Sequence, residues 1–265
     1  MALIGIIALG SVAWLVHHRA SSPTTAVPAA QTPINVIFPE GLRREQIASI
    51  LAAKTDLSAS QYLALTATGG EGEVLSGKKA PRSLEGFLFP ATYPIFPTTT
   101  VSDVVNEQLT AFRQYTAAVD YRYAESKNLS PYDVLTIASM VEREVAVPSE
   151  RVVVAGVIYN RLRLGMTLGI DATVQYALGY WKTKLTQSDL QIDSPYNTRR
   201  FPGLPPGPIC NPGLPSIQAA AHPAHVAYLY YVARNDGTGR HYFATTLAQF
   251  NHDVATSNAN LARGG

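Results

Sequence analysis

The chain of 265 residues is poor in cysteine and in charge. Its single cysteine, Cys210, excludes an internal disulfide framework and a zinc site with four cysteine ligands. Charged residues make up 15% of the chain, the formal net charge is +2, and no run of adjacent Lys or Arg is longer than two residues, as at Arg199-Arg200. Because nucleic-acid-binding proteins gather Lys and Arg on one surface, this pattern gives no support to that class of function.

Several catalytic motifs are absent from the sequence as well. It contains no Gly-rich phosphate loop and no Gly-x-Ser-x-Gly motif, which disfavours phosphoryl transfer and serine hydrolysis. His222 and His225 are three residues apart, but Pro223 lies between them and no Glu stands at metal-ligand spacing. We therefore predict neither a metal nor a cofactor.

The first 33 residues are expected to lie outside the folded domains. Residues 2–16 form an uncharged apolar run, shorter than the ~20 residues that span a bilayer as a helix. We predict that residues 1–20 are a membrane anchor or signal segment; a cleavable peptide and a buried core helix are the alternatives. Residues 21–33, rich in Ser, Thr, Pro and Ala, are predicted to be a linker.

The remainder, in a chain that is 46% hydrophobic, can bury a substantial core. Residues 35–38 have the composition of a short strand, followed by an amphipathic helix and a second helix near residues 58–66. We assign residues 34–68 to a small strand-helix subdomain and residues 69–265 to a mostly helical second domain. The predicted class is α+β, with a C-terminal β-hairpin formed by strands at Tyr228–Val232 and His241–Phe243.

A central helix is predicted to begin after Ser130, a good N-cap residue followed by Pro131, a good first helical residue. Its apolar stripe places Glu142 and Glu144, in the last turn, on opposite flanks at the border between core and solvent. Partial burial and the negative end of the helix dipole both raise the pKa of such a carboxyl, as a general acid requires. Two solvated glutamates remain the alternative, and geometry alone does not choose between them.

The next helix is expected to be capped by Ser149 and to end at Gly165. Asn160, near its end, can line a cleft or remain solvated. Asp171 precedes a third short helix, where N-capping is its expected role. The Pro- and Gly-rich segment at residues 193–213 has the character of a binding loop on a rigid scaffold.

Several of these segments together resemble the MltG (YceG-like) endolytic murein transglycosylases. The resemblance covers roughly residues 35–254 and is carried by long motifs in a fixed order: LEGFLFPATY, ASMVEREVAVPSER, IYNRLRLGMTLGIDATVQYALG, SPYNT, GLPPGPICNPG, AAAHP and YLYYVARNDGTGRHYFATT. The chain departs from the family where Asp171-Ala172-Thr173 replaces Asp-Pro-Thr and where Ala91 replaces a common Asp. It also keeps one LysM-like subdomain, at about residues 34–68, where two are common.

The resemblance implies which residues act. The second glutamate of the family's E-x-E helix is catalytic, and that position is Glu144. Tyr196, Asn197 and Thr198 match the Tyr-Asn-Thr segment beside the cleft, and Glu85 matches the acidic residue of the E-G-F/Y-x-F-P element. With these residues, Asn160 and Asp171 complete our set of candidate substrate-binding residues.

The resemblance also implies a reaction and a place. It implies lytic cleavage of peptidoglycan between N-acetylmuramic acid and N-acetylglucosamine, by one acid/base glutamate, with a 1,6-anhydromuramic acid product. A single-pass protein of the cytoplasmic membrane is expected, with an extracytoplasmic catalytic domain and with peptidoglycan glycan strands and peptidoglycan synthases as partners. A hydrolase, which would need a second carboxylate such as Asp171 or Asp193, and a wall-binding module without catalysis remain as alternatives.

Overall fold

The computed structural model describes residues 32–68 and 83–264, which lie within one compact unit of the chain. The predicted anchor or signal segment lies outside these residues, as does nearly all of the predicted linker. Among the described helices, none combines the length and the apolar character that spanning a bilayer requires. The described part has the predicted α+β class, mostly helical with two small antiparallel sheets.

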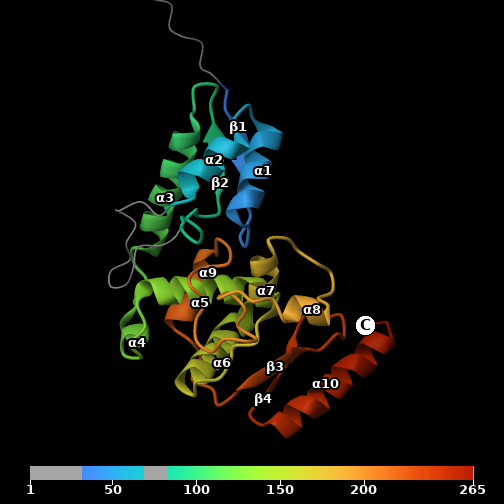
Figure 1. Cartoon of the computed structure of the whole chain (residues 1–265). Helices are drawn as coiled ribbons and strands as arrows, with labels where there is room; N and C mark the ends of the chain where they lie inside the picture. Colours follow the sequence, from blue (N-terminus) through green and yellow to red (C-terminus); the bar gives the residue numbers. More distant parts are fainter. Residues whose placement is uncertain (1–31, 69–82, 265) are drawn as a thin grey trace, which may run out of the picture. The chain divides into compact units, whose positions relative to one another are not determined.

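The N-terminal part forms a two-stranded sheet with three helices (Figure 1). Its elements are β1 (Ile34–Ile37), α1 (Arg44–Lys54), α2 (Ala59–Thr66), β2 (Thr92–Ile95) and α3 (Val101–Thr116). The predicted strand and the two helices that follow it are therefore present. Because β1 pairs with β2, which lies beyond residue 68, this sheet draws on both predicted domains, and the boundary at residue 68 stays a prediction.

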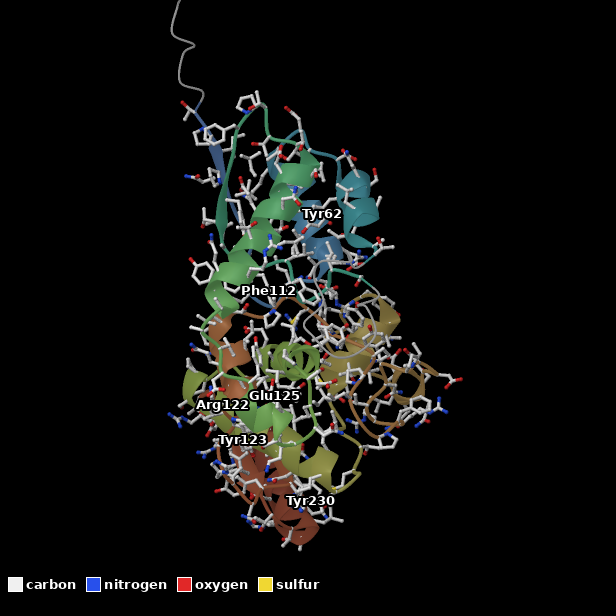
Figure 2. All side chains as sticks on the ribbon, turned by 90° about the vertical axis from the view of Figure 1, so that its left-hand side faces the viewer. Tyr62, Phe112, Arg122, Tyr123, Glu125 and Tyr230 are labelled. Carbon is white, nitrogen blue, oxygen red and sulfur yellow. The ribbon has the colours of Figure 1, made fainter. Side chains whose placement is uncertain are left out.

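The core of this part includes Tyr62 of α2 and Phe112 of α3, which are labelled in Figure 2. The Tyr62 hydroxyl donates a 2.7 Å hydrogen bond to Gln108 Oε1, so the one polar atom of this buried ring is paired. Such pairing removes most of the cost of burying a hydroxyl group.

The second part contains the remaining helices and the predicted hairpin. Its elements are α4 (Arg122–Glu125), α5 (Pro131–Glu144), η1 (a 3₁₀ helix, Pro148–Glu150), α6 (Arg151–Arg163), α7 (Asp171–Leu178), α8 (Gln187–Leu190), α9 (Leu214–Ala221), β3 (Tyr230–Ala233), β4 (His241–Ala244) and α10 (Leu247–Ala262). The central helix α5 contacts α6, α7 and α9, and α10 lies along the β3–β4 hairpin (Figure 1).

Helix α5 begins as its sequence predicts. Ser130 Oγ accepts a hydrogen bond from Asp133 N at 3.2 Å, and Asp133 Oδ2 accepts one from Ser130 N at 2.8 Å, with Pro131 as the first helical residue. This reciprocal capping box satisfies two backbone donors at the start of the helix. The helix ends at Glu144, so both glutamates lie in its last turn, as predicted.

Two predicted helix caps are wrong. Ser149 lies inside η1, and α6 starts after Glu150 without a side-chain cap, because the 3₁₀ turn leads directly into the helix. Asp171 is the first residue of α7 and does not cap it. The chain enters α7 at Ile170, whose N–H donates to Thr198 Oγ1 and whose carbonyl accepts from Thr173, so tertiary contacts define this helix start.

The two parts are joined by a buried polar cluster around Asn211. Its side-chain oxygen accepts from the N–H groups of Gly86 and Leu88, and its amide nitrogen donates to Glu85 Oε1 at 2.8 Å. Asn211 also forms a β-bridge with Leu42. One amide side chain thus connects the loop before α9 with two separate segments of the N-terminal part.

Candidate active site

Glu144, at the last position of α5, faces the β3–β4 hairpin. The Tyr231 hydroxyl donates a hydrogen bond to Glu144 Oε2 at 3.1 Å, and a backbone hydrogen bond links the carboxylate with Ala172 at the start of α7. The side chain is partly buried. The end of one helix, the start of another and a strand therefore meet at this carboxyl group.

Glu142 lies on the other flank of α5, as the helical period predicts. Its Oε2 accepts a hydrogen bond from Gly213 N at 3.2 Å, so it supports the loop that leads into α9. Glu40 lies nearby, and its pKa is raised by burial and by the negative charge of Glu142. The two glutamates thus have different neighbours, and Glu142 has a structural partner of its own.

The surroundings of Glu144 favour its protonated form. Burial raises the pKa of Glu144 above its ordinary value, and the negative charge of Asp171 acts in the same direction. The hydrogen bond from Tyr231, the charge of His241 and the backbone hydrogen bond with Ala172 oppose this rise of the pKa. Since desolvation is the largest contribution, a protonated acid is available at higher pH than for a solvated glutamate.

Asp171 and Asp193, the two carboxylates that a hydrolase would draw on, are both exposed and paired with arginine. Asp171 Oδ1 lies 2.6 Å from Arg199 Nη1, and Asp193 Oδ1 lies 3.3 Å from Arg200 Nη1. Asp171 is close enough to Glu144 for its negative charge to raise the pKa of Glu144, and its selection as a substrate-binding residue stays a prediction.

The register of the hairpin explains why Tyr231 reaches Glu144. Tyr231 lies opposite Phe243, and His241 lies two residues before Phe243 on the partner strand, so these three side chains share one face of the two strands. Tyr230 is on the other face and stacks on Phe250 of α10, with ring centroids 5.3 Å apart. Because side chains alternate along a strand, only one of these adjacent tyrosines can face α5.

His241 is held by a buried carboxylate. Its Nδ1 lies 2.7 Å from Glu150 Oε2, and its backbone N–H donates to the same carboxylate at 3.2 Å. The His241 ring stands edge-on to the Tyr231 ring, with centroids 5.4 Å apart and an interplanar angle of 90°. Glu150, at the start of α6, therefore also fixes a residue of the hairpin.

Asn160 and Arg161 hold the segment that leads into β3. Asn160 Nδ2 donates to the carbonyl oxygens of Val226 and Tyr228 at 2.8 and 3.0 Å, and Arg161 Nε donates to that of Leu229. The structure thus places Asn160, a candidate for substrate binding, where both hydrogens of its amide are already used. Its position still matters to the site, because the segment it holds leads into the strand of Tyr231.

The Tyr196-Asn197-Thr198 segment is brought beside α7, but its three side chains differ. Asn197 is buried and donates to the carbonyl oxygens of Leu190 and Ile192, while Thr198, also buried, holds the start of α7. Tyr196 is partly exposed, and its ring centroid lies 4.7 Å from that of Tyr176. Of the three side chains, that of Tyr196 is the most accessible to a ligand.

Glu85 lies apart from the Glu144 cluster. It is 2% exposed and accepts hydrogen bonds from Arg44 N and Asn211 Nδ2. Burial raises its pKa to about 8, and the charge of Glu45 contributes in the same direction. The contacts place this candidate binding residue in the polar cluster that joins the two parts of the chain.

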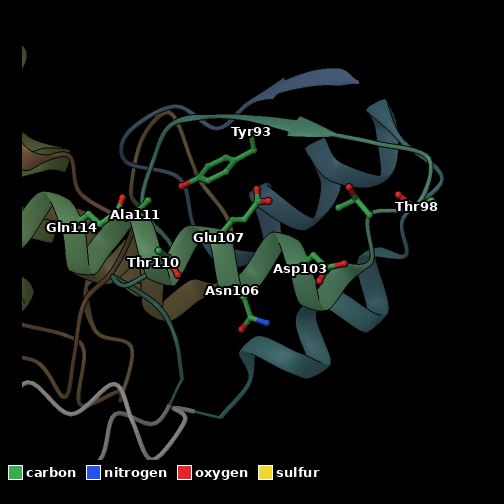
Figure 3. Close-up of a pocket in the computed structure, with 9 residues that line it drawn as sticks. Tyr93, Thr98, Asp103, Asn106, Glu107, Thr110, Ala111 and Gln114 are labelled. Carbon is green, nitrogen blue, oxygen red and sulfur yellow. The ribbon is translucent and has the colours of Figure 1, made fainter. Parts of the chain in front are cut away.

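The described surface also holds cavities away from Glu144. Figure 3 shows the groove between β2 and α3, where the ring of Tyr93 lies near Glu107 and Asp103 lies further along α3. Asp103 is used as a helix-capping partner of Thr100. Because these elements carry none of the neighbours of Glu144, the groove is separate from the candidate active site. Within the described residues, no cluster of His, Cys, Asp and Glu is arranged to hold a metal ion.

Sequence reasoning missed Tyr231, His241 and Glu150 as residues of the site. Residues 228–233 are all apolar or aromatic, and α10 packs along the hairpin, so no alternation of polar and apolar residues marked the tyrosine that faces Glu144. The one available signal was the hairpin turn, which predicts the pairing of the two strands and so brings Tyr231 and His241 together.

The chain is similar to proteins of one family. The sequence model of the YceG-like family matches residues 16–256. An endolytic murein transglycosylase of Bacillus subtilis (strain 168) is 36% identical over 230 residues, which are 80% of this chain and 62% of that protein. One of Streptococcus pneumoniae (strain ATCC BAA-255 / R6) is 35% identical over 224 residues, which are 82% of this chain and 40% of that protein. The chain thus spans less than two thirds of each of these relatives.

A solved structure shares the fold. The crystal structure of a YceG-like protein from Listeria monocytogenes matches with a TM-score of 0.72 at 35% sequence identity. The match covers 83% of this chain and 76% of that protein. Since the family model and the solved structure both match most of the chain, this protein belongs to the YceG-like family.

Proposed function

We propose that the protein is an endolytic murein transglycosylase. It cleaves the β-1,4 bond between N-acetylmuramic acid and N-acetylglucosamine and leaves a 1,6-anhydromuramic acid end. The observation that carries the proposal is the position of Glu144, a partly buried carboxyl with a raised pKa at the meeting point of α5, α7 and the hairpin. The two bacterial relatives, both named endolytic murein transglycosylases, support the same reaction class.

In the proposed mechanism Glu144 acts twice. As an acid it gives its proton to the glycosidic oxygen, and the C1–O bond breaks with its electron pair going to that oxygen. The muramic acid C6 hydroxyl oxygen then bonds to C1, and its proton returns to the Glu144 carboxylate. Because the nucleophile belongs to the substrate, positioning contributes much of the acceleration, and the acid/base group adds roughly 10²–10⁴-fold.

We infer supporting roles for the other candidate residues. Tyr196 contacts the sugars, while Asn197 and Thr198 hold its loop in place through the hydrogen bonds described above. Asn160 and Glu85 act through the architecture of the site, and Asp171 acts by raising the pKa of Glu144. Replacing Tyr196 by Phe should weaken substrate binding while the pH profile stays in place; a displaced profile would contradict this role.

The test is the identity of the products. Residues 32–265 are incubated with purified peptidoglycan in ¹⁸O-labelled water, and the new ends are analysed by mass spectrometry. We expect 1,6-anhydromuramic acid ends without ¹⁸O. A hydrolase would place ¹⁸O on C1, and a wall-binding module would release no fragments; either result would overturn the proposal.

We further propose where the enzyme works. The N-terminal segment anchors it in the cytoplasmic membrane as a single-pass protein, the catalytic domain lies outside that membrane, and cleavage ends the elongation of new glycan strands made by peptidoglycan synthases. Residues 34–68 and 69–265 are its proposed subdomain and catalytic domain. Protease treatment of intact spheroplasts tests the topology: the domain should be digested without lysis, and full protection would contradict the proposal.

A further inference from the structure

Three side chains extend from Glu144 into the hairpin and α6: Tyr231, His241 and Glu150. We propose that Tyr231 is a second catalytic residue, whose hydroxyl stabilises the carboxylate that Glu144 becomes after it gives up its proton. We propose further that the His241–Glu150 pair is a positioning element that holds Tyr231 in place. This inference rests on the proposed role of Glu144 as the acid and base of the reaction.

The Tyr231 hydroxyl already has the contact that this role needs. It lies 3.1 Å from Glu144 Oε2, in a site formed by elements that are far apart in the sequence. Burial, together with the adjacent Glu144, raises the pKa of Tyr231 well above its ordinary value. Tyr231 therefore keeps its proton throughout the pH range in which an enzyme works, and it acts as a hydrogen-bond donor without transferring a proton.

The hydrogen bond strengthens as the reaction proceeds. A neutral Glu144 carboxyl accepts it weakly, whereas a carboxylate accepts it as a charge-assisted bond, which is shorter and roughly twice as strong. An interaction that is stronger in the transition state than in the bound substrate lowers the barrier. Tyr231 therefore favours the transfer of the proton from Glu144 to the glycosidic oxygen.

The His241–Glu150 pair fixes the ring of Tyr231. Both members are buried, and the Glu150 carboxylate lies within hydrogen-bond distance of the Nδ1 and of the backbone N–H of His241. The edge of the imidazole then meets the Tyr231 ring at 90°. Because two bonds from one carboxylate hold both the backbone and the ring of His241, the neighbouring tyrosine packs against a rigid surface.

The charged groups around Glu144 and Tyr231 also influence their pKa values, so a test variant must leave these groups unchanged. Asp171 faces it from α7, paired with Arg199, and His241 faces it from β4. From α6, Arg161 acts on Tyr231 and lowers its pKa in opposition to burial. On α5 itself, Glu142 bonds to Gly213, and Arg143 Nη1 donates to the Gly41 carbonyl. A phenylalanine at position 231 removes the hydroxyl and leaves all these charges in place.

The first experiment compares Tyr231→Phe with Tyr230→Phe, the neighbouring tyrosine on the opposite face of the same strand. The pKa of Glu144 is measured by ¹³C NMR titration of the glutamate carboxyl signals, assigned by the signal lost in Glu144→Gln. Turnover on peptidoglycan is measured across pH. These two readouts are independent, so the bond is tested even if Glu144→Gln shows that the proposed function itself is wrong.

We expect Tyr231→Phe to raise the pKa of Glu144 by ~1–2 and to lower turnover by about 10–100-fold. The rate falls as pH rises through the pKa of Glu144, so the alkaline limb of the pH profile should move to higher pH. Tyr230→Phe should change neither quantity. Turnover that falls in Tyr231→Phe while the pKa of Glu144 stays the same would reduce Tyr231 to a packing role and overturn the proposal.

The second experiment tests the positioning role of His241. His241→Ala should lower turnover by about tenfold, and the double variant with Tyr231→Phe should be no slower than Tyr231→Phe alone, because His241 has no hydroxyl left to position once Tyr231 is replaced. His241→Asn, whose amide can still donate a hydrogen bond to Glu150, should recover most of the turnover. Additive losses, or no recovery with Asn, would overturn the positioning role.

Discussion

At the scale of single residues, the two glutamates of α5 have identical side chains but different surroundings, and the surroundings give them different roles. Glu142 bonds to a backbone N–H in a loop, whereas Glu144 is partly buried against a tyrosine and has a raised pKa. They are two positions apart, which on a helix turns them to different neighbours. One is suited to hold structure and the other to donate a proton.

We therefore expect Glu144→Gln to lower peptidoglycan cleavage by at least about 10²-fold, the lower end of what a general acid contributes. Glu142→Gln should stay within about tenfold of the wild type, because Gln can still accept the hydrogen bond of Gly213 through its side-chain oxygen. Release of soluble fragments measures activity, and thermal melting controls for folding. Equal losses in the two variants, at equal melting temperatures, would contradict the assignment.

Glu85 offers a prediction about stability. Its pKa of about 8 in the folded protein exceeds its ordinary value of 4.5, so the folded state binds more protons than the unfolded state between these pH values. The contribution of Glu85 to the free energy of unfolding is complete below its pKa in the unfolded state. It is lost as the pH rises through its pKa in the folded state. Denaturant unfolding should show this loss, and Glu85→Gln should make the stability less dependent on pH between roughly 5 and 8.

The size of the Glu85 effect is bounded by its pKa, since a tenfold change in proton affinity corresponds to about 1.4 kcal/mol. Between roughly pH 5 and 8, we expect the free energy of unfolding of the wild type to fall by on the order of 2–4 kcal/mol more than that of Glu85→Gln. Both proteins keep Glu144 and Glu40, whose raised pKa values act in the same direction, so the difference isolates Glu85. If the free energies of unfolding of the two proteins changed with pH in parallel, the pKa of Glu85 would not be raised by burial.

At the scale of elements, α6 positions the strand of Tyr231 through close packing. Gly156 lies so near the segment after α9 that a Cβ there would be 2.5 Å from the Ala224 carbonyl oxygen and 2.9 Å from Val226 Cγ2. One turn further on, Asn160 binds the Val226 and Tyr228 carbonyls. The glycine permits the close approach, and the asparagine then fixes the path of the chain toward β3.

Gly156→Ala should therefore destabilise the protein by about 1–3 kcal/mol, although alanine is favoured over glycine in a helix by about 1 kcal/mol. Activity should fall as well, because displacing residues 224–228 moves Tyr231. Gly165→Ala is the matched control: its φ of +66° is strained for alanine, but nothing lies within 4 Å, so it should lose stability and keep activity. A Gly156→Ala protein as stable and active as the wild type would contradict this packing argument.

At the scale of the whole described molecule, Arg43 is a second link between the N-terminal part and the rest. It is 4% exposed, and its guanidinium carbon lies 4.9 Å from the ring centroid of Tyr176 and 4.4 Å from that of Trp181. Its Nε and Nη2 have no hydrogen-bond partner in the part of the chain that the structure describes. Burial lowers the pKa of Arg43, and stacking on two aromatic rings, together with the negative charge of Glu85, opposes the cost of that burial.

We expect Arg43→Ala to destabilise the fold by about 2 kcal/mol, the value of a desolvated cation–π contact, and to lower the melting temperature by about 4–8 °C for a chain of this size. Arg122→Ala removes an exposed arginine that pairs with Asp120 and should change stability by less than about 1 kcal/mol. Differential scanning calorimetry measures both. Equal melting temperatures for the two variants would show that the aromatic contacts of Arg43 add nothing.

The sequence by itself determined the features that depend on neighbouring residues. The apolar period of α5, its Ser130–Asp133 cap, the opposite directions of Glu142 and Glu144, and the hairpin all follow from local geometry, which a few adjacent residues specify. The predictions of the helix, its cap and the hairpin hold because helix and strand periods are properties of the backbone and do not depend on distant partners. The family motifs likewise pointed to Glu144, whose catalytic role stays a prediction.

Only the tertiary structure decided which groups surround Glu144 and which candidate residues are buried. Tyr231 is 87 residues away from Glu144, and His241 is 91 residues away from Glu150. Ser149 and Asp171 fail as caps, and Asn197 and Thr198 are buried, because contacts with other elements compete with their local preferences. Desolvation and pairing depend on what the whole chain brings together in space, and that cannot be read from the order of residues in one segment.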